Sequence, residues 1–244
     1  MKLIGAGLPR TATTTQMIAL EQLGLPCYHM RNLMTNMEAH LPLWYEALEG
    51  RGDWEAIFDG CTSTVDWPAA FHYRELMDVY PDAKVLLSVR NHESWERSMR
   101  DTIWEIYFGR GVLHHLAQAR YQIDPAFRAW YDLNVRMCWV TGAPFAGAYA
   151  ERQQLIDAAA RWDDEVKSTV PAERLIVWEP ADGWEPICAA VGVPVPDEPL
   201  PNVNDTNGFK DGIMGGALEA IQGWFAEKGG GGAHGFNDPS ARHA

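Results

Sequence analysis

Long apolar runs and an excess of positive charge are both missing from this chain of 244 residues. No apolar stretch approaches the roughly 20 residues of a membrane-spanning helix, so no membrane span is expected. The formal net charge of −13 argues against a general nucleic-acid-binding protein, which normally carries a basic face. A local pocket on an acidic protein can still be positive, so a small anionic ligand remains compatible with this charge.

Closely spaced cysteines are missing as well. The four cysteines form no Cys-x-x-Cys pair; they are Cys27, Cys61, Cys138 and Cys188. This spacing argues against a structural zinc site and fits reduced thiols in the cytosol. The N-terminus lacks a charged leader followed by an apolar core and a cleavage site. We therefore expect a cytoplasmic protein without a bound metal.

The chain alternates short β-like runs with helical patterns. The expected strands are residues 2–4, 61–65, 84–89 and 174–178, and the expected helices are residues 13–23, 69–80 and 93–108. Residues 113–170 are expected to be helical throughout. This alternation predicts an α/β fold of three layers with a central parallel sheet, in one domain over residues 1–228, with a helical cap at about 110–170. The glycine-rich residues 229–244 are predicted to be a flexible tail.

One motif follows the first strand directly: GAGLPRTATTT, residues 5–15. A strand, a glycine-bearing turn and a helix that starts with threonine point backbone N–H groups at an anion, and the helix dipole favours negative charge there. Arg10 adds a cation that cannot lose its proton. The Gly-Lys pair of kinase phosphate loops is missing, which disfavours a kinase. The alternative interpretation is an ordinary strand-to-helix turn with a threonine cap.

A second candidate anion site lies in KVLLSVRNHESWERSM, residues 84–99. Arg90 follows a buried strand, and Ser98 lies eight residues later on the next helix. The carboxyl ends of parallel strands are where open α/β sheets bind ligands. Each residue alone has an ordinary explanation, as a surface ion-pair partner or a helix residue. Together with the first loop, they suggest a ligand that carries two separate phosphate groups.

At these residues the chain resembles the sulfotransferases that use 3′-phosphoadenosine 5′-phosphosulfate (PAPS), above all their bacterial single-domain branch. The family's loop reads Pro-Lys-Ser-Gly-Thr-Thr-Trp, and the sequence here is PRTATTT. The resemblance covers about residues 2–210 and implies a P-loop-like fold with a helical lid and PAPS as co-substrate. Its implied nucleotide-binding residues are Pro9, Arg10, Thr11, Ala12, Thr13, Thr14, Arg90 and Ser98.

The chain departs from the family pattern at two loop positions. Ala12 replaces the loop glycine, which predicts a backbone that does not need positive φ. Thr15 replaces an aromatic residue that often stacks on adenine, so Phe209 is the candidate for that stacking. A basic residue late in the family closes over the 3′-phosphate, and Lys210 is its candidate here. The alternative for Lys210 is a solvated loop lysine.

Three residues are candidates for the catalytic chemistry. We expect Arg10 to stabilise the charge that develops on the leaving phosphate. Asp66 occupies the place of a family histidine, in TVDWP, and can accept the acceptor's proton if the hydroxyl lies within hydrogen-bond reach. Its alternative role is to cap the helix that starts at residue 69. His29, in PCYHM, is the rival base, with a purely structural role as its alternative.

The sequence thus predicts a PAPS-dependent sulfotransferase that acts on the hydroxyl of a small or medium-sized molecule. Some of the eleven tryptophans are expected to line an apolar acceptor cleft, although core packing accounts for most of them. Two alternatives remain open. One is a phosphotransferase with a variant P-loop, and the other is a nucleotide-binding protein without catalytic turnover. The sequence names neither the acceptor nor the oligomeric state.

Overall fold

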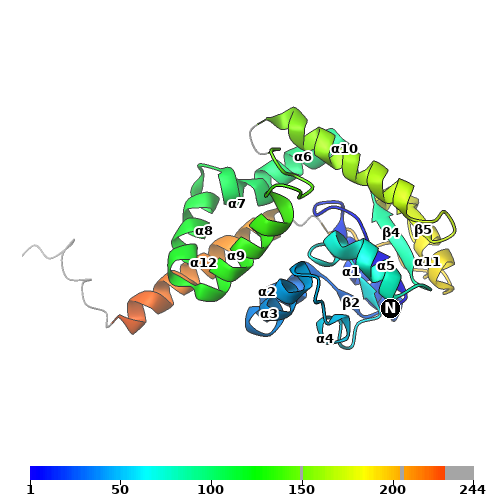
Figure 1. Cartoon of the computed structure of the whole chain (residues 1–244), viewed down its shortest axis with the longest axis horizontal. Coiled ribbons are helices and arrows are strands. Elements are labelled where there is room, and N and C mark those ends of the chain that lie inside the picture. Colours follow the sequence, from blue (N-terminus) through cyan, green and yellow to red (C-terminus); the bar gives the residue numbers. More distant parts are fainter. Residues whose placement is uncertain (149–150, 204–205, 229–244) are drawn as a thin grey trace, which may run out of the picture.

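The computed structural model describes residues 1–148, 151–203 and 206–228. Its centre is a sheet of five parallel strands in the order β2-β3-β1-β4-β5 (Figure 1). The strands are β1 (Leu3–Gly5), β2 (Cys27–Tyr28), β3 (Ser63–Thr64), β4 (Lys84–Ser88) and β5 (Leu175–Trp178). Because all strands run in the same direction, their carboxyl ends meet along one edge of the sheet.

Helices cover both faces of this sheet, because the strands carry apolar side chains on both faces. On one face, Leu3 and Leu86 pack in one core cluster with side chains of α1 (Thr13–Gln22) and α11 (Glu185–Val191). On the other face, Ile4 and Leu87 join the main core. Successive strand residues point to opposite faces, so a strand buried on both faces needs an uninterrupted apolar run. The predicted three-layer α/β fold is confirmed.

The other helices divide between the sheet and a separate helical lobe. Against the main core lie 3₁₀ segment η1 (Ala69–His72), α5 (Tyr73–Val79), α6 (His92–Met99) and α10 (Arg152–Thr169). Next to β2 and β3 lie α2 (Met30–Thr35), α3 (Met37–Leu48) and α4 (Trp54–Ile57). The lobe consists of α7 (Glu105–Phe108), α8 (Val112–Ile123), α9 (Pro125–Cys138) and the long α12 (Thr206–Glu227), which packs along α8 (Figure 1). A short 3₁₀ segment, Pro180–Asp182, follows β5.

The boundaries of the expected cap differ from those of this lobe. Helix α10, expected inside the cap, instead packs along α6, and the indole N–H of its Trp162 donates to the Ala6 carbonyl at 2.8 Å. The lobe also recruits α12, more than 60 residues further along the chain. The helix predicted over 93–108 runs from His92 and contains a π-helical segment, Arg100–Trp104. The expected glycine-rich tail, 229–244, lies outside the described residues.

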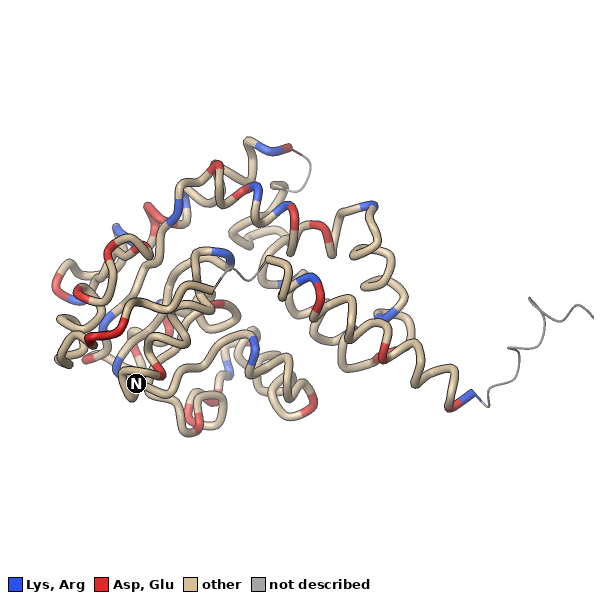
Figure 2. The backbone as a smooth tube through the Cα atoms, turned by 180° about the vertical axis from the view of Figure 1, so that it is seen from behind, with Lys and Arg blue, Asp and Glu red and all other residues tan. Residues whose placement is uncertain are grey.

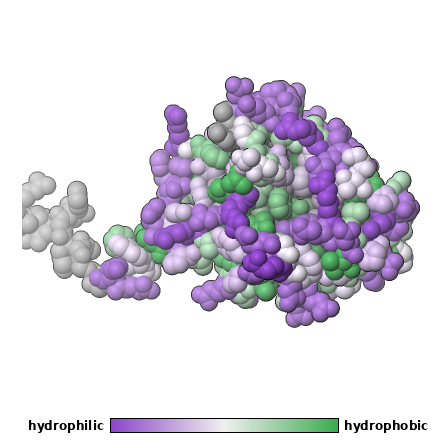
Figure 3. Space-filling model, in the orientation of Figure 1, coloured by the Kyte–Doolittle hydropathy of each residue, from purple (hydrophilic) through white to green (hydrophobic). Residues whose placement is uncertain are grey.

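Charged residues of both signs are interspersed over the sheet region and the lobe (Figure 2). One face of the molecule shows hydrophobic surface in its middle, between the sheet region and the lobe, with hydrophilic residues around it (Figure 3). In the described part of the chain, no helix combines the length and the apolar character that crossing a membrane requires.

Candidate active site

The loop after β1 is held in place by two indole groups. The indole N–H of Trp95 donates to the Pro9 carbonyl at 2.8 Å, and that of Trp162 donates to the Ala6 carbonyl. The loop also approaches β4 closely, since a Cβ on Gly7 would lie 1.9 Å from Ser88 Oγ. Only glycine fits this contact. The backbone that connects β1 to α1 is therefore fixed from several sides.

The backbone of the loop corrects one prediction. Ala12 has φ 63° and ψ 34°, in the left-handed region, although the sequence predicted no need for positive φ. Arg10 and Asp66 also have positive φ, at 70° and 68°, and these three are the non-glycine residues with positive φ in the described chain. Ala12 is the N-terminal flanking residue of α1, and no side chain caps the helix there. The residue at the cap position is thus an alanine and not the threonine of the alternative interpretation, and the first N–H groups of an α-helix have no acceptor within the helix itself.

The hydroxyl groups of the loop differ in direction. Thr11 Oγ1 donates to the Leu8 carbonyl and lies 2.6 Å from Ser88 Oγ, so this hydroxyl joins the loop to the end of β4. Thr13 and Thr14 line two cavities, one on each side of the loop, whereas Thr11 lines one of them. Thr13 Oγ1 also lies 3.2 Å from His29 Nε2.

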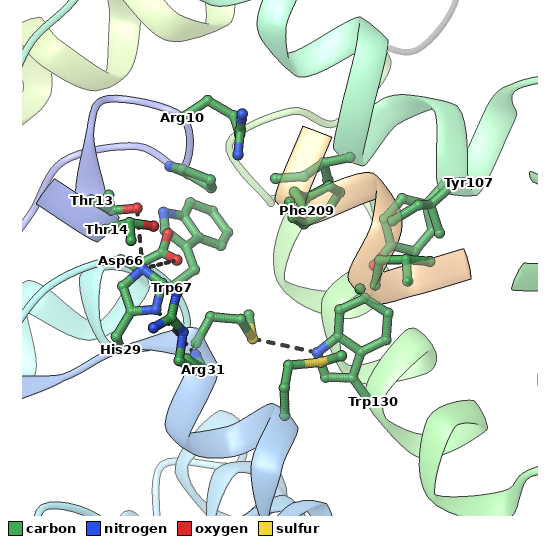
Figure 4. A pocket seen from close by; sticks show the side chains of 18 residues that line it. Arg10, Thr13, Thr14, His29, Arg31, Asp66, Trp67, Tyr107, Trp130 and Phe209 are labelled. Atoms are coloured by element: carbon green, nitrogen blue, oxygen red, sulfur yellow. Dashed lines mark hydrogen bonds and ion pairs between the residues drawn. The ribbon is translucent and has the colours of Figure 1, made fainter. Parts of the chain in front are cut away.

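The two cavities share Arg10, Thr13 and Thr14 but differ in chemistry. One, of about 410 Å³, is lined by the start of α1 and by Arg90, Asn91 and Ser94. We call it the cationic cavity. The other, of about 330 Å³, has mainly apolar walls and contains Asp66 and His29; we call it the apolar cavity. Figure 4 shows Thr13, Asp66 and His29 on one side of the apolar cavity and Phe209, Tyr107 and Trp130 on the opposite side.

In the cationic cavity, Arg90 is held by the first turn of α6. Its Nε donates to Ser94 Oγ at 3.1 Å, and its Nη1 donates to the Arg10 carbonyl at 3.1 Å. Burial and the neighbouring Arg97 lower the pKa of Arg90 from its ordinary value. An anion beside these two cations would favour their charged forms.

Ser98, which was expected to bind the same phosphate group as Arg90, contacts Arg10 and does not line the cationic cavity. Arg10 Nε donates to Ser98 Oγ at 3.2 Å, and Arg10 Nη2 donates to Thr206 Oγ1 at 2.9 Å. Ser94, which the sequence analysis did not select, lines the cationic cavity beside Arg90. The interval of four residues from Arg90 could have identified it, because the first turn of a helix after a strand faces the strand end.

On the other side of the loop, Asp66 and His29 are in contact. Asp66 Oδ2 lies 3.1 Å from His29 Nε2, which is also 3.2 Å from Thr13 Oγ1, and both residues are buried. His29 Nδ1 accepts the N–H of Arg31 at 3.1 Å and so caps α2. A nitrogen that accepts a hydrogen bond carries no proton, so the proton of the neutral ring is assigned to Nε2, facing the carboxylate. At the start of η1 the flanking residue is Pro68, and the Ala70 N–H donates to the backbone carbonyl of Asp66 at 3.0 Å.

Phe209 and Lys210 lie at the start of α12. Phe209 lines the apolar cavity, and its ring stacks below the Arg10 guanidinium at 5.4 Å. Phe209 therefore lines the apolar cavity and not the cationic cavity that contains Arg90. Lys210 is half-buried and belongs to neither lining. Residues 204–205, shortly before α12, lie outside the described residues.

Several lining residues were not selected from the sequence. Thr206 lines the cationic cavity, as do Glu179 and Pro180, which follow β5. Two tryptophans of the eleven, Trp67 and Trp130, line the apolar cavity. The described residues contain no group of three or more His, Cys, Asp or Glu side chains that could hold a metal ion.

The strand order explains how these residues come together. His29, Asp66, the loop with Arg10, and Arg90 follow β2, β3, β1 and β4, which are consecutive neighbours in the sheet. The four groups therefore lie in this order along one edge, with the carboxylate and imidazole on one side of the loop and the second arginine on the other.

Known proteins share this sequence pattern. The family model described as "Sulfotransferase domain" matches residues 2–209. A protein named "Ava biosynthesis cluster protein M", from Aspergillus versicolor, is 28% identical over 218 residues, which cover 85% of this chain and 82% of that protein. The resemblance seen in the sequence is thus confirmed over nearly the whole described domain, and the chain belongs to the sulfotransferase domain family.

Proposed function

We propose that this protein transfers a sulfuryl group from PAPS to a hydroxyl of a small or medium-sized acceptor: R–OH + PAPS → R–O–sulfate + adenosine 3′,5′-bisphosphate + H⁺. The observation that carries this proposal is the loop at residues 9–14, which lies between a cationic and an apolar cavity and contributes Arg10, Thr13 and Thr14 to both. A group transferred between two ligands must pass between their sites, and this loop forms that boundary.

The donor set of the cationic cavity fits a nucleotide with two phosphate groups. Arg90, with the nearby Arg97, supports an anion at the end of β4, and the N–H groups at the start of α1 support a second anion. When bound there, PAPS supplies the sulfuryl group. Ser94 accepts a hydrogen bond from Arg90 Nε, and Thr13 and Thr14 line both cavities.

Arg10 is proposed to stabilise the transition state. It lines both cavities, and Ser98 and Thr206 orient its guanidinium by accepting two of its hydrogen bonds. A cation fixed in advance beside the breaking bond neutralises developing charge without reorganisation. Fixed arginine, amide and hydroxyl donors can fill the role that magnesium has in kinases.

Asp66 is proposed as the base that takes the acceptor's proton. The Nε2–H of His29 faces Asp66, and its Nδ1 is already an acceptor for the Arg31 N–H, so the neutral ring has no free lone pair for the acceptor hydroxyl. Of the two candidate bases, the carboxylate is therefore the better supported. His29 becomes a positioning residue that orients Asp66 through one hydrogen bond.

The proposal is tested by product analysis. The purified protein is incubated with 2-naphthol and either PAPS plus EDTA or ATP plus magnesium, and products are identified by mass spectrometry. We expect naphthyl sulfate with PAPS and no naphthyl phosphate with ATP. Phosphate transfer would support the variant phosphotransferase. Tight binding of adenosine 3′,5′-bisphosphate without turnover of any hydroxyl acceptor would support a silent nucleotide-binding protein.

A further inference from the structure

Helix α12 turns two glycines toward the apolar cavity. Gly208 and Gly212 line it together with Phe209 and Ile213, and the helix is held there by its packing along α8. Glycine in a helix interior destabilises the helix relative to alanine, so a glycine at such a position needs a reason. The match to the sulfotransferase domain ends at residue 209, so Gly212 lies beyond it.

The glycines of α12 differ in what a side chain would meet. A Cβ on Gly216 would lie 2.5 Å from Arg120 Nη1 of α8, so this glycine allows the two helices to approach each other. A Cβ on Gly212 would meet no atom within 4 Å, and the same holds for Gly215. Gly212 lines the cavity and Gly215 does not. The missing side chain at Gly212 therefore leaves volume in the cavity and relieves no close contact.

The other walls of the cavity indicate what fills this volume. They are formed by apolar and aromatic side chains, namely Met30, Met34, Trp67, Ile103, Ile106, Tyr107 and Trp130. Tyr107 is buried, and burial raises its pKa well above the ordinary value, so it stays uncharged at neutral pH. The charged side chains of this lining are Arg10, Arg31 and Asp66. An uncharged ring system with one hydroxyl directed at Asp66 fits such walls.

We propose that Gly212 is a specificity-determining residue, which keeps room in the apolar cavity for an uncharged, ring-bearing hydroxyl compound. The statement that the compound carries a hydroxyl to which a group is transferred rests on the proposed function. The statement that it carries a ring system rests on the lining of the cavity alone. A larger side chain at position 212 occupies the place of the ring that lies against α12. Smaller phenols remain substrates because they reach Asp66 without contacting α12.

The inference is tested by binding of N-phenyl-1-naphthylamine, an uncharged two-ring fluorophore. Its dissociation constant is measured by fluorescence titration for the wild type, Gly212→Leu and the matched variant Gly215→Leu. We expect Gly212→Leu to bind about tenfold more weakly or worse, and Gly215→Leu to bind like the wild type. The pair Gly212→Ala and Gly215→Ala is measured as well. Both are expected to raise the melting temperature, because alanine favours the helix, and only Gly212→Ala weakens binding.

Unchanged binding in Gly212→Leu, equal weakening in both leucine variants, or no binding by the wild type would overturn the inference. A second readout separates this failure from failure of the proposed function. Adenosine 3′,5′-bisphosphate is expected to raise the melting temperature of all three proteins equally, because Gly212 does not line the cationic cavity. If the fluorophore pattern holds and the bisphosphate binds to none of them, the cavity assignment stands and sulfuryl transfer fails.

Discussion

At the scale of single residues, backbone strain is concentrated in the candidate site. Arg10, Ala12 and Asp66 are the non-glycine residues with positive φ in the described chain, and all three line one of the two cavities. Such conformations cost about 1–3 kcal/mol each and persist where the surrounding structure determines them. Here the surrounding structure includes the indole N–H groups of Trp95 and Trp162, which hold the loop backbone.

This strain predicts that Ala12→Gly stabilises the protein. The exchange relieves the cost of a left-handed conformation, about 1–2 kcal/mol for an L-residue. It also raises the entropy of the unfolded chain, which lowers stability by about 0.4–1 kcal/mol, so we expect the free energy of unfolding to rise by about 0.5–1 kcal/mol. The free energy of unfolding is measured by urea denaturation. The matched exchange Ala19→Gly, buried in the same helix, should lower it by about 1 kcal/mol or more. A loss of stability in Ala12→Gly would contradict the assigned backbone.

The contact between His29 and Asp66 predicts non-additive kinetics. Asp66→Asn should lower kcat by about 10²–10⁴-fold, as expected for loss of a general base. His29→Ala should lower it by about 10- to 100-fold, because a hydrogen bond to a charged group is worth about 1.5–3 kcal/mol. If His29 acts only through Asp66, His29→Ala has no further effect in the Asp66→Asn background. Multiplicative losses at unchanged KM for PAPS would instead make His29 an independent catalytic group.

Two serines on α6 provide a matched pair. Ser94 accepts a hydrogen bond from Arg90, and Ser98 accepts one from Arg10. We expect Ser94→Ala to raise the Kd for adenosine 3′,5′-bisphosphate by about 3- to 10-fold, since one hydrogen bond contributes about 0.5–1.5 kcal/mol. Ser98→Ala should mainly lower kcat. Calorimetric titration and initial rates measure the two effects, and the reverse pattern would return the 3′-phosphate role to Ser98.

The sequence identified most of these residues but not their conformations. Arg90 was selected because it follows a buried strand, Arg10 as the fixed cation of the loop after the first strand, and Asp66 because it occupies the place of a family histidine at the end of a strand. Strand ends meet at one edge of a parallel sheet. The positive φ of Ala12 was missed, because the conformation is imposed by contacts of the loop with distant residues. The contact of Arg90 with Ser94 was missed for a similar reason, since it depends on the side-chain direction of Arg90.

At the scale of elements, strand order places the two halves of the site. The order β2-β3-β1-β4 puts the Asp66–His29 pair and Arg90 on opposite sides of the loop. Strand β2 has two residues, and its sequence carries too little periodicity to predict. Helix α12 was also not predicted: its glycines give it a weak intrinsic helix propensity, and packing against α8 compensates for this.

The tryptophan that joins α10 to the loop gives an element-scale prediction. Trp162→Phe leaves the Ala6 carbonyl without its indole donor, so we expect a loss of about 1–3 kcal/mol in the free energy of unfolding and weaker binding of adenosine 3′,5′-bisphosphate. Trp184 is a matched control: it is equally buried, and its indole N–H donates to the Glu198 carbonyl at 2.8 Å and not to the loop. Trp184→Phe should lower stability and leave binding unchanged. Equal loss of binding in both variants would show a general effect of destabilisation.

At the scale of the whole molecule, the sheet region and the helical lobe enclose the apolar cavity from two sides. Asp66, His29 and the loop come from the sheet region, and Tyr107, Trp130 and Phe209 come from the lobe (Figure 4). The molecule carries a formal net charge of −13 and also has a cationic cavity at one edge of the sheet. Global charge influences the approach of ligands, and the local donors decide which ligand binds.

The most direct test of the account is the melting temperature in the presence of adenosine 3′,5′-bisphosphate with EDTA, compared with ATP plus magnesium. A ligand at about 100 times its Kd stabilises the native state by about 2.7 kcal/mol, which corresponds to about 5–10 °C for a domain of this size. We predict this rise with the bisphosphate alone, and its loss in Arg90→Ala. A rise that requires ATP and magnesium, or none with either nucleotide, would contradict the account.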